Sequence, residues 1–212
     1  DIKTSAAAQL SFLSSSNKMF KLTFSGTKAL FDIMDLKNNH ELQQERLEPY
    51  PGTLYVVGTP IGNLGDLSPR ANAILKNVSL IACEDTRRSG QLLKTIKSKV
   101  PLLSYHKNNL KSRESHILEI LKSKGSIALI SDAGLPGISD PGEELVLAAR
   151  LNSFEVICIP GPCAATTALA ISGLPSQRFC FEGFLPQKQS IRKKRLKDIS
   201  QENRTTIIYE SP

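Results

Sequence analysis

The sequence predicts an α/β protein with a mostly parallel sheet, and two observations support this prediction. From Gly52 onward, short apolar runs typical of buried strands alternate with longer segments that have helical spacing. Parallel strands need a crossover connection, usually a helix, so this alternation favours a parallel sheet. In addition, glycine- and proline-rich loops follow the runs that end at Val57, Ile130 and Ile159. Ligands bind outside the carboxyl ends of the strands in such sheets, so we expect these three loops to converge on one crevice.

The individual elements follow from local signals. Ser68 and Pro69 suit an N-cap and a first helical position, so a helix is expected directly after the first glycine-rich loop. Ile117 and Leu121 fall on one side of a helical segment. The expected strands are 54–57, 78–83, 102–105, 127–130, 156–159, 179–184 and 205–209. The expected helices are about 69–76, 89–96, 112–122, 141–151, 163–171, which is Ala-rich, and 191–199, which is basic.

The loop after the strand 127–130 is longer than its connection requires. Strand-to-helix loops usually need about 2–6 residues, whereas this one runs from Ser131 to Ser139. Its glycines allow a ligand to approach the backbone, and its proline holds one shape. Asp140 is expected to be the N-cap of the next helix and Pro141 its first residue. We interpret the loop as a rigid small-molecule cradle; the alternative is a surface turn that binds nothing.

Composition narrows the class of partner. The chain has 212 residues and a formal net charge of +7, which favours a polyanionic partner. It has no apolar run long enough to span a membrane.

Its four cysteines form no CxxC pair, and we expect reduced structural thiols in a reducing compartment. His106 and His116 lack the spacing of metal ligands, so no metal site is expected.

Residues 1–50 differ from the rest of the chain. The stretch from Thr4 to Phe31 is rich in hydroxyl side chains and Lys and contains no acidic residue. This composition resembles an organellar transit peptide, although such peptides carry Arg and this stretch has none. The alternative is that Met19 or Met34 is the true start. Residues 1–50 are therefore expected to be a disordered leader or transit-like extension, mostly outside the fold. The protein would be cytoplasmic, or plastid or mitochondrial if residues 1–33 are a transit peptide.

Charged residues follow the second predicted strand. Glu84 and Asp85 end it, where an acidic group can hydrogen-bond ribose hydroxyls. The alternative is that they cap the next helix, with Arg87 or Arg88 paired to them. The loop 58–65 is neither GxGxxG nor a Walker A motif, so it gives little support to a dinucleotide or triphosphate site.

The densest basic stretch lies near the C-terminal end of the sequence. It contains Lys188, the run from Arg192 to Arg195, and Lys197. Phosphate contact is one interpretation of such a run. The other is a solvated helix face, and the residues alone leave both open.

Five segments in order form a specific pattern: YVVGTPIGNL at 55–64, EDTR at 84–87, SDAG through ISDPG at 131–142, PGPCA at 160–164 and FEGFLP at 181–186. Together they resemble the ribosomal RNA small-subunit methyltransferase I family of the tetrapyrrole methylase superfamily. The resemblance runs from about Gly52 to Pro212. It implies two α/β domains, about 52–160 and 161–212, with a cleft between them that binds S-adenosylmethionine. It also implies 2′-O-methylation of a cytidine in 16S-type rRNA, rRNA or the small ribosomal subunit as partner, no membrane association, and a homodimer.

Candidate roles follow for individual residues. The resemblance does not settle the base: Asp85 and Glu84 are the candidates, with Lys107 a weaker one. Arg87 is assigned to the catalytic group, where it orients a phosphate or pairs with Asp85. The expected cofactor-binding residues are Pro60, Gly62, Asn63, Ser131, Asp132, Ala133, Gly134, Pro136, Gly161, Pro162 and Ala164. The expected RNA-binding residues are Arg88, Lys107, Lys188, Arg192, Lys193, Lys194 and Arg195.

Two departures from the family pattern stand out. Leu135 occupies a position where relatives usually have Thr, which removes a hydroxyl from the cradle. The chain also stops at Pro212, where relatives continue, so the second domain is expected to be incomplete.

Two rival functions stay open. One is methylation of a tetrapyrrole or another small molecule, and the other is a non-catalytic rRNA- or ribosome-binding remnant.

Overall fold

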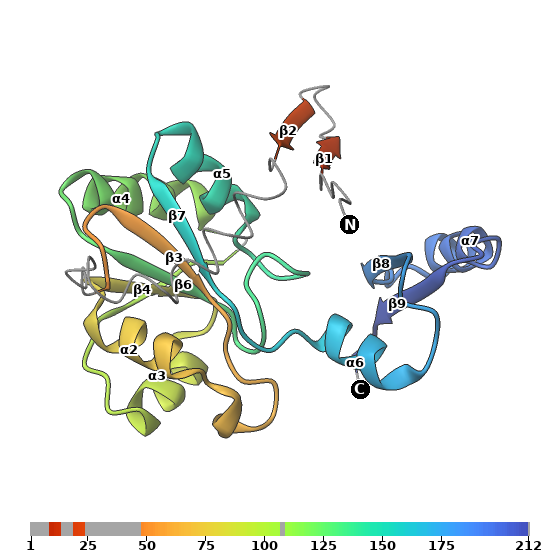
Figure 1. The fold of residues 1–212 in the computed structure, drawn as a ribbon, viewed down its shortest axis with the longest axis horizontal. Helices are drawn as coiled ribbons and strands as arrows, with labels where there is room; N and C mark the ends of the chain where they lie inside the picture. The colour runs from red at the N-terminus through yellow and green to blue at the C-terminus, as the bar shows by residue number, and fades with distance from the viewer. Residues whose placement is uncertain (1–8, 14–18, 24–47, 107–108, 212) are drawn as a thin grey trace, which may run out of the picture. The chain divides into compact units, whose positions relative to one another are not determined.

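The computed structural model describes residues 9–13, 19–23, 48–106 and 109–211 (Figure 1). It divides into two units, 1–46 and 47–212. In the first unit, β1 (Gln9–Leu13) pairs antiparallel with β2 (Met19–Thr23), a hairpin that the sequence did not predict. Most of residues 1–50 lie outside the described part of the chain. The leader or transit-like extension therefore stays a prediction.

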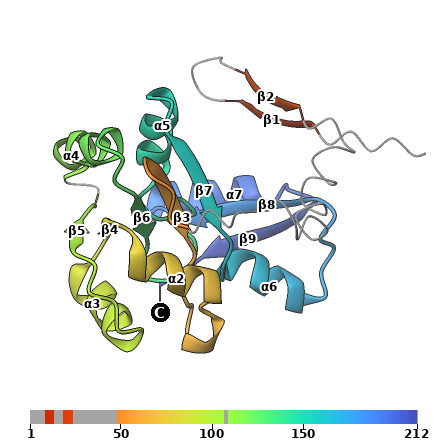
Figure 2. The same cartoon turned by 60° about the vertical axis from the view of Figure 1, so that its left-hand side comes forward.

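A five-stranded parallel sheet is the centre of the second unit, as Figure 2 shows. The strand order is β5-β4-β6-β3-β7, so β6 lies between β4 and β3. The strands are β3 (Thr53–Val57), β4 (Leu80–Cys83), β5 (Leu102–Ser104), β6 (Ile127–Ile130) and β7 (Glu155–Ile159). The predicted α/β class with a parallel sheet is confirmed, with strand ends within two residues of the predicted ones.

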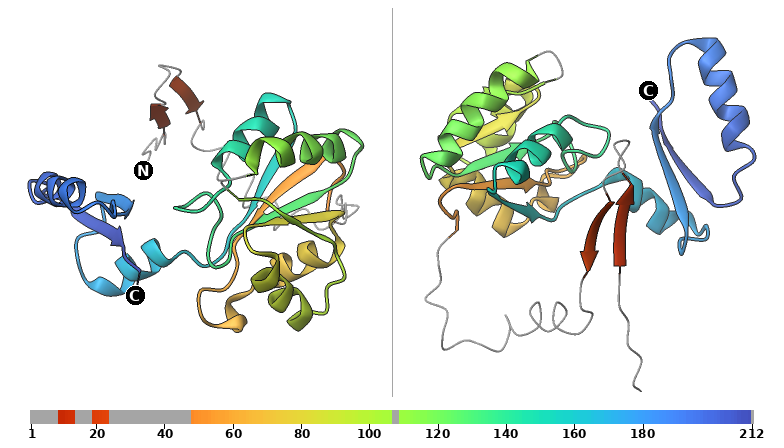
Figure 3. Two further views of the ribbon diagram at one scale, coloured as in Figure 1. Left: turned by 180° about the vertical axis from the view of Figure 1, so that it is seen from behind. Right: turned by 90° about the horizontal axis from the view of Figure 1, so that it is seen from above.

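Helices cover both faces of this sheet (Figure 3). The first pair, α2 (Pro69–Asn77) and α3 (Thr86–Thr95), lies on one face. The second pair, α4 (Leu110–Lys122) and α5 (Glu143–Leu151), lies on the other. Successive strand residues point to opposite faces, so each strand contributes to two cores. In β6, for example, Ile130 packs with α2 and α3, whereas Leu129 packs with α4 and α5.

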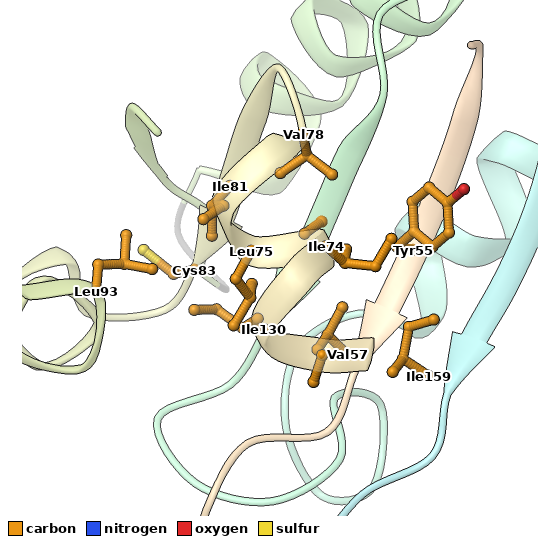
Figure 4. Packing of buried hydrophobic residues seen from close by; sticks show 12 residues of the cluster. Tyr55, Val57, Ile74, Leu75, Val78, Ile81, Cys83, Leu93, Ile130 and Ile159 are labelled. Atoms are coloured by element: carbon orange, nitrogen blue, oxygen red, sulfur yellow. The ribbon is translucent and has the colours of Figure 1, made fainter. Parts of the chain in front are cut away.

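The core on the α2 side is continuous from strand to helix (Figure 4). Tyr55 and Val57 of β3 meet Ile74 and Leu75 of α2, and all four side chains are fully buried. Burying a large apolar side chain stabilises a fold by about 1.5–3 kcal/mol. The same packing fixes the ends of the strands, from which the loops at the carboxyl edge of the sheet emerge.

A smaller parallel sheet follows Pro160. It pairs β8 (Phe179–Phe184) with β9 (Thr205–Tyr209) through the crossover helix α7 (Gln189–Ile199), and α6 (Ala164–Ser172) precedes it. The predicted bounds of both strands are confirmed. The register shifts between Phe181 and Gly183, which inserts a bulge into β8. Along the chain, one sheet thus precedes Pro160 and the other follows it. A domain boundary at this residue stays a prediction.

Five helix starts differ from the sequence prediction by one to three residues, and those of α5 and α3 bear on the site. α5 begins at Glu143, with Gly142 as its N-cap at φ +148°, so the predictions of Asp140 as N-cap and Pro141 as first helical residue are wrong. A positive φ of this kind is open to glycine, and it turns the chain into the helix two residues later than the Asp-Pro pair suggests. α3 begins at Thr86 instead of residue 89, because the Asp85 carboxylate accepts the backbone N–H of Arg87 at 2.8 Å. Asp85 is thus a helix cap.

Candidate functional site

The carboxyl ends of β3 and β7 meet through two glycines. The Gly58 N–H donates to the Ile159 carbonyl at 3.1 Å. Immediately beyond, a Cβ on Gly58 would lie 2.7 Å from the Cα of Gly161. Contacts below 3 Å between a Cβ and backbone are forbidden by sterics, so both positions require glycine while the two backbones stay this close. The loops after β3 and β7 are therefore held together at their bases.

The loop after β6 is tied to the loop after β3. Thr59 and Gly134 exchange two backbone hydrogen bonds, of 2.9 Å and 3.1 Å. The Thr59 hydroxyl donates to the Ser131 and Gly134 carbonyls at 3.3 Å each. Gly134 has a φ of +88°, and a Cβ there would lie 3.6 Å from the Pro162 carbonyl oxygen. The three glycine- and proline-rich loops thus converge, as the order of strands and loops predicted.

Asp132 connects this loop cluster to α3. Its Oδ1 accepts the backbone N–H of Asp85 at 3.3 Å, and its Oδ2 pairs with the Arg88 guanidinium at 3.2 Å. The Asp132 side chain is 22% exposed and that of Arg88 is 71% exposed. Asp132 is therefore the better anchored partner, and Arg88 is the one that faces solvent.

Two cavities lie at this edge of the sheet. Cavity A, of about 430 Å³, is lined by Thr59, Pro60, Leu64, Arg88, Gln91, Leu92, Thr95 and Asp132. Cavity B, of about 500 Å³, is lined by Glu84, Asp85, Thr86, Arg87, Arg88, Ser104, His106 and Asp132. Both volumes fall in the range of small-molecule sites, about 300–1,000 Å³. Arg88 and Asp132 belong to both cavities.

The Asp85 carboxylate is strongly acidic because of its neighbour. The Arg87 guanidinium donates to its two oxygens at 3.2 Å and 2.9 Å. Together with the backbone N–H of Arg87, this lowers the pKa of Asp85 to about 2. At neutral pH Asp85 is thus an ionised hydrogen-bond acceptor, but a weak base while Arg87 holds it. Of the two arrangements expected for Arg87, the structure shows pairing with Asp85.

The predicted RNA-binding residues separate into groups. Arg88 lies in the cavities, whereas the others that the structure describes belong to α7 or to Lys188 just before it. Two of the α7 arginines pair with acidic side chains: Arg192 with Glu210, directly after β9, at 2.6 Å, and Arg195 with Glu182 of β8. Lys193 and Lys194 are exposed, and Lys107 lies outside the described residues.

The predicted cofactor residues are only partly gathered in one cavity. Pro60 and Asp132 line cavity A. Asn63 instead caps the 3₁₀ turn η1 (Leu64–Asp66), because its side chain accepts the Gly65 N–H at 2.9 Å. The others belong to the surrounding loops: Gly62, Ser131, Ala133, Gly134, Pro136, Gly161, Pro162 and Ala164.

Sequence reasoning missed one wall of cavity A. This wall is a face of α3 formed by Arg88, Gln91, Leu92 and Thr95, which are spaced as successive turns of one helix side. That spacing was readable, but nothing in the sequence alone indicated that this side of α3 borders the site. Thr59 was also missed, although it lies between Gly58 and Pro60 in the first loop.

The described part of the chain has neither a membrane-spanning helix nor a metal-ligand cluster. In the ranges that the structure describes, no helix is long and apolar enough to cross a membrane. The same ranges hold no group of three or more His, Cys, Asp and Glu side chains that could bind a metal ion.

Comparison with known proteins places this site in a context. The family model described as "Tetrapyrrole (Corrin/Porphyrin) Methylases" matches residues 53–212. Over 161 residues the chain is 52% identical to a Synechocystis sp. protein named "Ribosomal RNA small subunit methyltransferase I", covering 76% of this chain and 58% of that protein. A protein of the same name from Xylella fastidiosa is 53% identical over 161 residues, covering 76% of this chain and 59% of that protein.

The matched region is a part of those relatives, since the chain spans about three fifths of their length. Among solved structures, a cobalt precorrin-4 methyltransferase superposes with a TM-score of 0.52 at 15% identity, covering 65% of this chain and 59% of that one. This likeness concerns the fold alone.

Proposed function

Because this chain belongs to the tetrapyrrole methylase family, we propose that it transfers a methyl group from S-adenosylmethionine to the 2′-hydroxyl of a cytidine in small-subunit rRNA. About half of the aligned residues are identical to those of relatives that are named for methylation of small-subunit rRNA. This identity is the observation that carries the proposal. The converging loops and the two cavities at the carboxyl edge of the sheet support it.

The loop cluster fits a cofactor of this size. Cavity A has a volume of about 430 Å³, and its lining residue Thr59 exchanges backbone hydrogen bonds with Gly134. A cradle made largely of backbone tolerates Leu135 in place of the Thr usual in relatives. The proposed cofactor contacts are Pro60, Gly62, Asn63, Ser131, Asp132, Ala133, Gly134, Pro136, Gly161, Pro162 and Ala164. When bound, S-adenosylmethionine supplies an electrophilic methyl group on a sulfonium.

With such an electrophile, the main task of the protein is to position the acceptor. In the proposed mechanism, cavity B holds the acceptor nucleotide, and the ionised Asp85 carboxylate accepts a hydrogen bond from the ribose hydroxyl. Asp85 or Glu84 takes the hydroxyl proton. Arg87 weakens Asp85 as a base, because its pairing keeps the pKa of Asp85 at about 2.

The proposal extends to partners and compartment. The partner is small-subunit rRNA or the assembled subunit, contacted by Arg88, Lys107, Lys188 and the α7 cations Arg192, Lys193, Lys194 and Arg195. The chain acts as a homodimer, which sedimentation velocity tests. It works in the cytoplasm, or in a plastid or mitochondrion if residues 1–33 are a transit peptide.

Two assays in sequence test the function against its rivals. Isothermal titration of the chain with S-adenosylmethionine is expected to show saturable binding. Methyl transfer with radiolabelled cofactor is then expected to label small ribosomal subunits and to leave a tetrapyrrole such as uroporphyrinogen III unlabelled. Label in the tetrapyrrole alone would support the small-molecule rival. Binding of rRNA without any cofactor binding would support the non-catalytic remnant.

A further inference from the structure

One ion pair borders both cavities. Arg88 and Asp132 line both cavity A and cavity B, and their side chains meet at 3.2 Å. The lining that the two cavities share is therefore a contact between two side chains. Unlike a backbone wall, it opens when one side chain changes rotamer.

The two partners are anchored unequally. The Asp132 carboxylate also accepts the Asp85 N–H at 3.3 Å, and its side chain is 22% exposed. The Arg88 side chain is 71% exposed, which leaves it free to choose other rotamers in solvent. When the pair opens, Arg88 is thus the side chain that moves.

Arg88 is also the more available of the two arginines in cavity B. Arg87 holds Asp85 with two hydrogen bonds, one to each carboxylate oxygen. Among the residues that the structure describes, the Arg88 guanidinium makes one hydrogen bond, of 3.2 Å, with Asp132. The remaining charged and titratable groups that line this cavity are Glu84 and His106. An incoming anion therefore meets less competition for Arg88 than for Arg87.

We propose that cavity B is a phosphodiester site whose cation is Arg88, and that Asp132 stays paired with this guanidinium until RNA binds. A backbone phosphate takes Arg88 from Asp132, and the opened contact joins the two cavities into one groove. The acceptor nucleotide and the cofactor cradle then face one space. This inference rests on the proposed function, since it assigns the two cavities to the acceptor and the cofactor.

The expected effect is modest, because exposed ion pairs are weak. Such pairs typically contribute so little that releasing one changes an equilibrium constant by about two- to fivefold. Asp132→Asn should therefore tighten binding of a short single-stranded RNA by about two- to fivefold. Asparagine keeps an oxygen that can accept the Asp85 N–H, so the loop should stay in place.

A double-mutant cycle separates this switch from the mere removal of a negative charge. The probe is a fluorescent RNA hexanucleotide, titrated by anisotropy against the chain and the variants Asp132→Asn, Arg88→Met and the double variant. Arg88→Met should weaken binding by about fivefold. In the Arg88→Met background, Asp132→Asn should change the affinity little. An equal gain from Asp132→Asn in both backgrounds would overturn the proposal, and so would a loss.

Two further arms complete the test. Inorganic phosphate should compete with the RNA in the wild-type chain and less in Arg88→Met; competition equal in both would overturn the assignment of Arg88. Cofactor titration of the wild-type chain separates the two proposals, because Asp132 is itself a proposed cofactor contact. Cofactor binding together with additive effects of the two substitutions overturns the switch and leaves the function standing. Coupled substitutions without any cofactor binding overturn the function and leave the phosphodiester site standing.

Discussion

Gly58 and Gly161 pack backbone against backbone where β3 and β7 end, and neither position has room for a side chain. A Cβ on Gly161 would lie 2.9 Å from the Cα, carbonyl carbon and carbonyl oxygen of Gly58. This contact fixes the separation of two loops that are expected to hold the cofactor. Glycine at these positions is therefore a requirement of the site geometry as much as of the fold.

Gly161→Ala should destabilise the chain by about 1–3 kcal/mol, because the methyl group forces the two backbones apart. It should also weaken binding of S-adenosylmethionine. The matched control is Gly90→Ala in α3, where the added Cβ would have its nearest neighbour at 3.9 Å. Alanine is the better helix former, so Gly90→Ala should be neutral or stabilising by up to about 1 kcal/mol. Urea unfolding measures both, and equal effects would contradict the steric account.

Removing the Arg87 side chain should raise the pKa of Asp85. Hydrogen bonds from Arg87 lower the pKa of Asp85 to about 2. In Arg87→Ala we expect it to rise towards the ordinary value of about 3.9. A carboxyl ¹³C NMR titration of Asp85 reports this directly. A titration midpoint near 4 in the wild-type chain would contradict the pairing.

The same pair sets a pH dependence of stability. Because the folded-state pKa of Asp85 lies below its unfolded value, its contribution to stability is present above about pH 4. It is lost as the pH falls through about 2. The stability difference between the wild-type chain and Arg87→Ala should shrink over this window and stay constant from pH 5 to 8. Chemical denaturation at a series of pH values measures it.

Two tyrosines should respond in opposite ways to loss of their hydroxyl. The Tyr105 hydroxyl is buried and has no hydrogen-bond partner among the described residues, and burial raises its pKa to about 12. Tyr105→Phe should thus be neutral or stabilising by about 1 kcal/mol. The Tyr209 hydroxyl accepts the Ala165 N–H at 3.0 Å, so Tyr209→Phe should cost about 1 kcal/mol. Thermal unfolding of both variants would contradict this reading if Tyr105→Phe were the more destabilising.

In the basic helix α7, some cationic side chains should bind RNA, whereas others should stay in ion pairs within the chain. Lys193 and Lys194 are exposed, whereas Arg192 pairs with Glu210 at 2.6 Å. Each exposed lysine that contacts a phosphate contributes about 0.7 to the slope of log affinity against log salt for single strands. Lys193→Ala should lower that slope by about this amount, and Arg192→Ala by less. Equal slopes for the two variants would show that the pairing with Glu210 does not keep Arg192 from contacting a phosphate.

Much of the fold was readable from the sequence, for reasons that β6 and β8 make clear. Ile127–Ile130 and Phe179–Phe184 were predicted with their observed bounds, because short apolar runs between turn residues are the direct signature of strands. The start of α5 was not, since the Asp-Pro pair looks like a cap and only the conformation of Gly142 shows where the helix begins.

Those features of the site that follow from the order of strands and loops were predictable from the sequence. Those that depend on how helices pack against loops were not. The convergence of Thr59, Gly134 and Gly161 follows from the rule that parallel strands end at one edge. The Arg88–Asp132 pair joins residues 44 positions apart. Spacing alone gives no information about such a contact, which depends on how α3 lies against the loop after β6.

The central claim is methyl transfer to a ribose hydroxyl of small-subunit rRNA. The most direct test is to incubate the chain with methyl-labelled S-adenosylmethionine and small ribosomal subunits, and then to hydrolyse the RNA with alkali. A 2′-O-methyl group removes the hydroxyl that alkaline cleavage needs, so the label should appear in an alkali-resistant dinucleotide that contains 2′-O-methylcytidine. Label released as an ordinary mononucleotide, or no label in the RNA, would contradict the account.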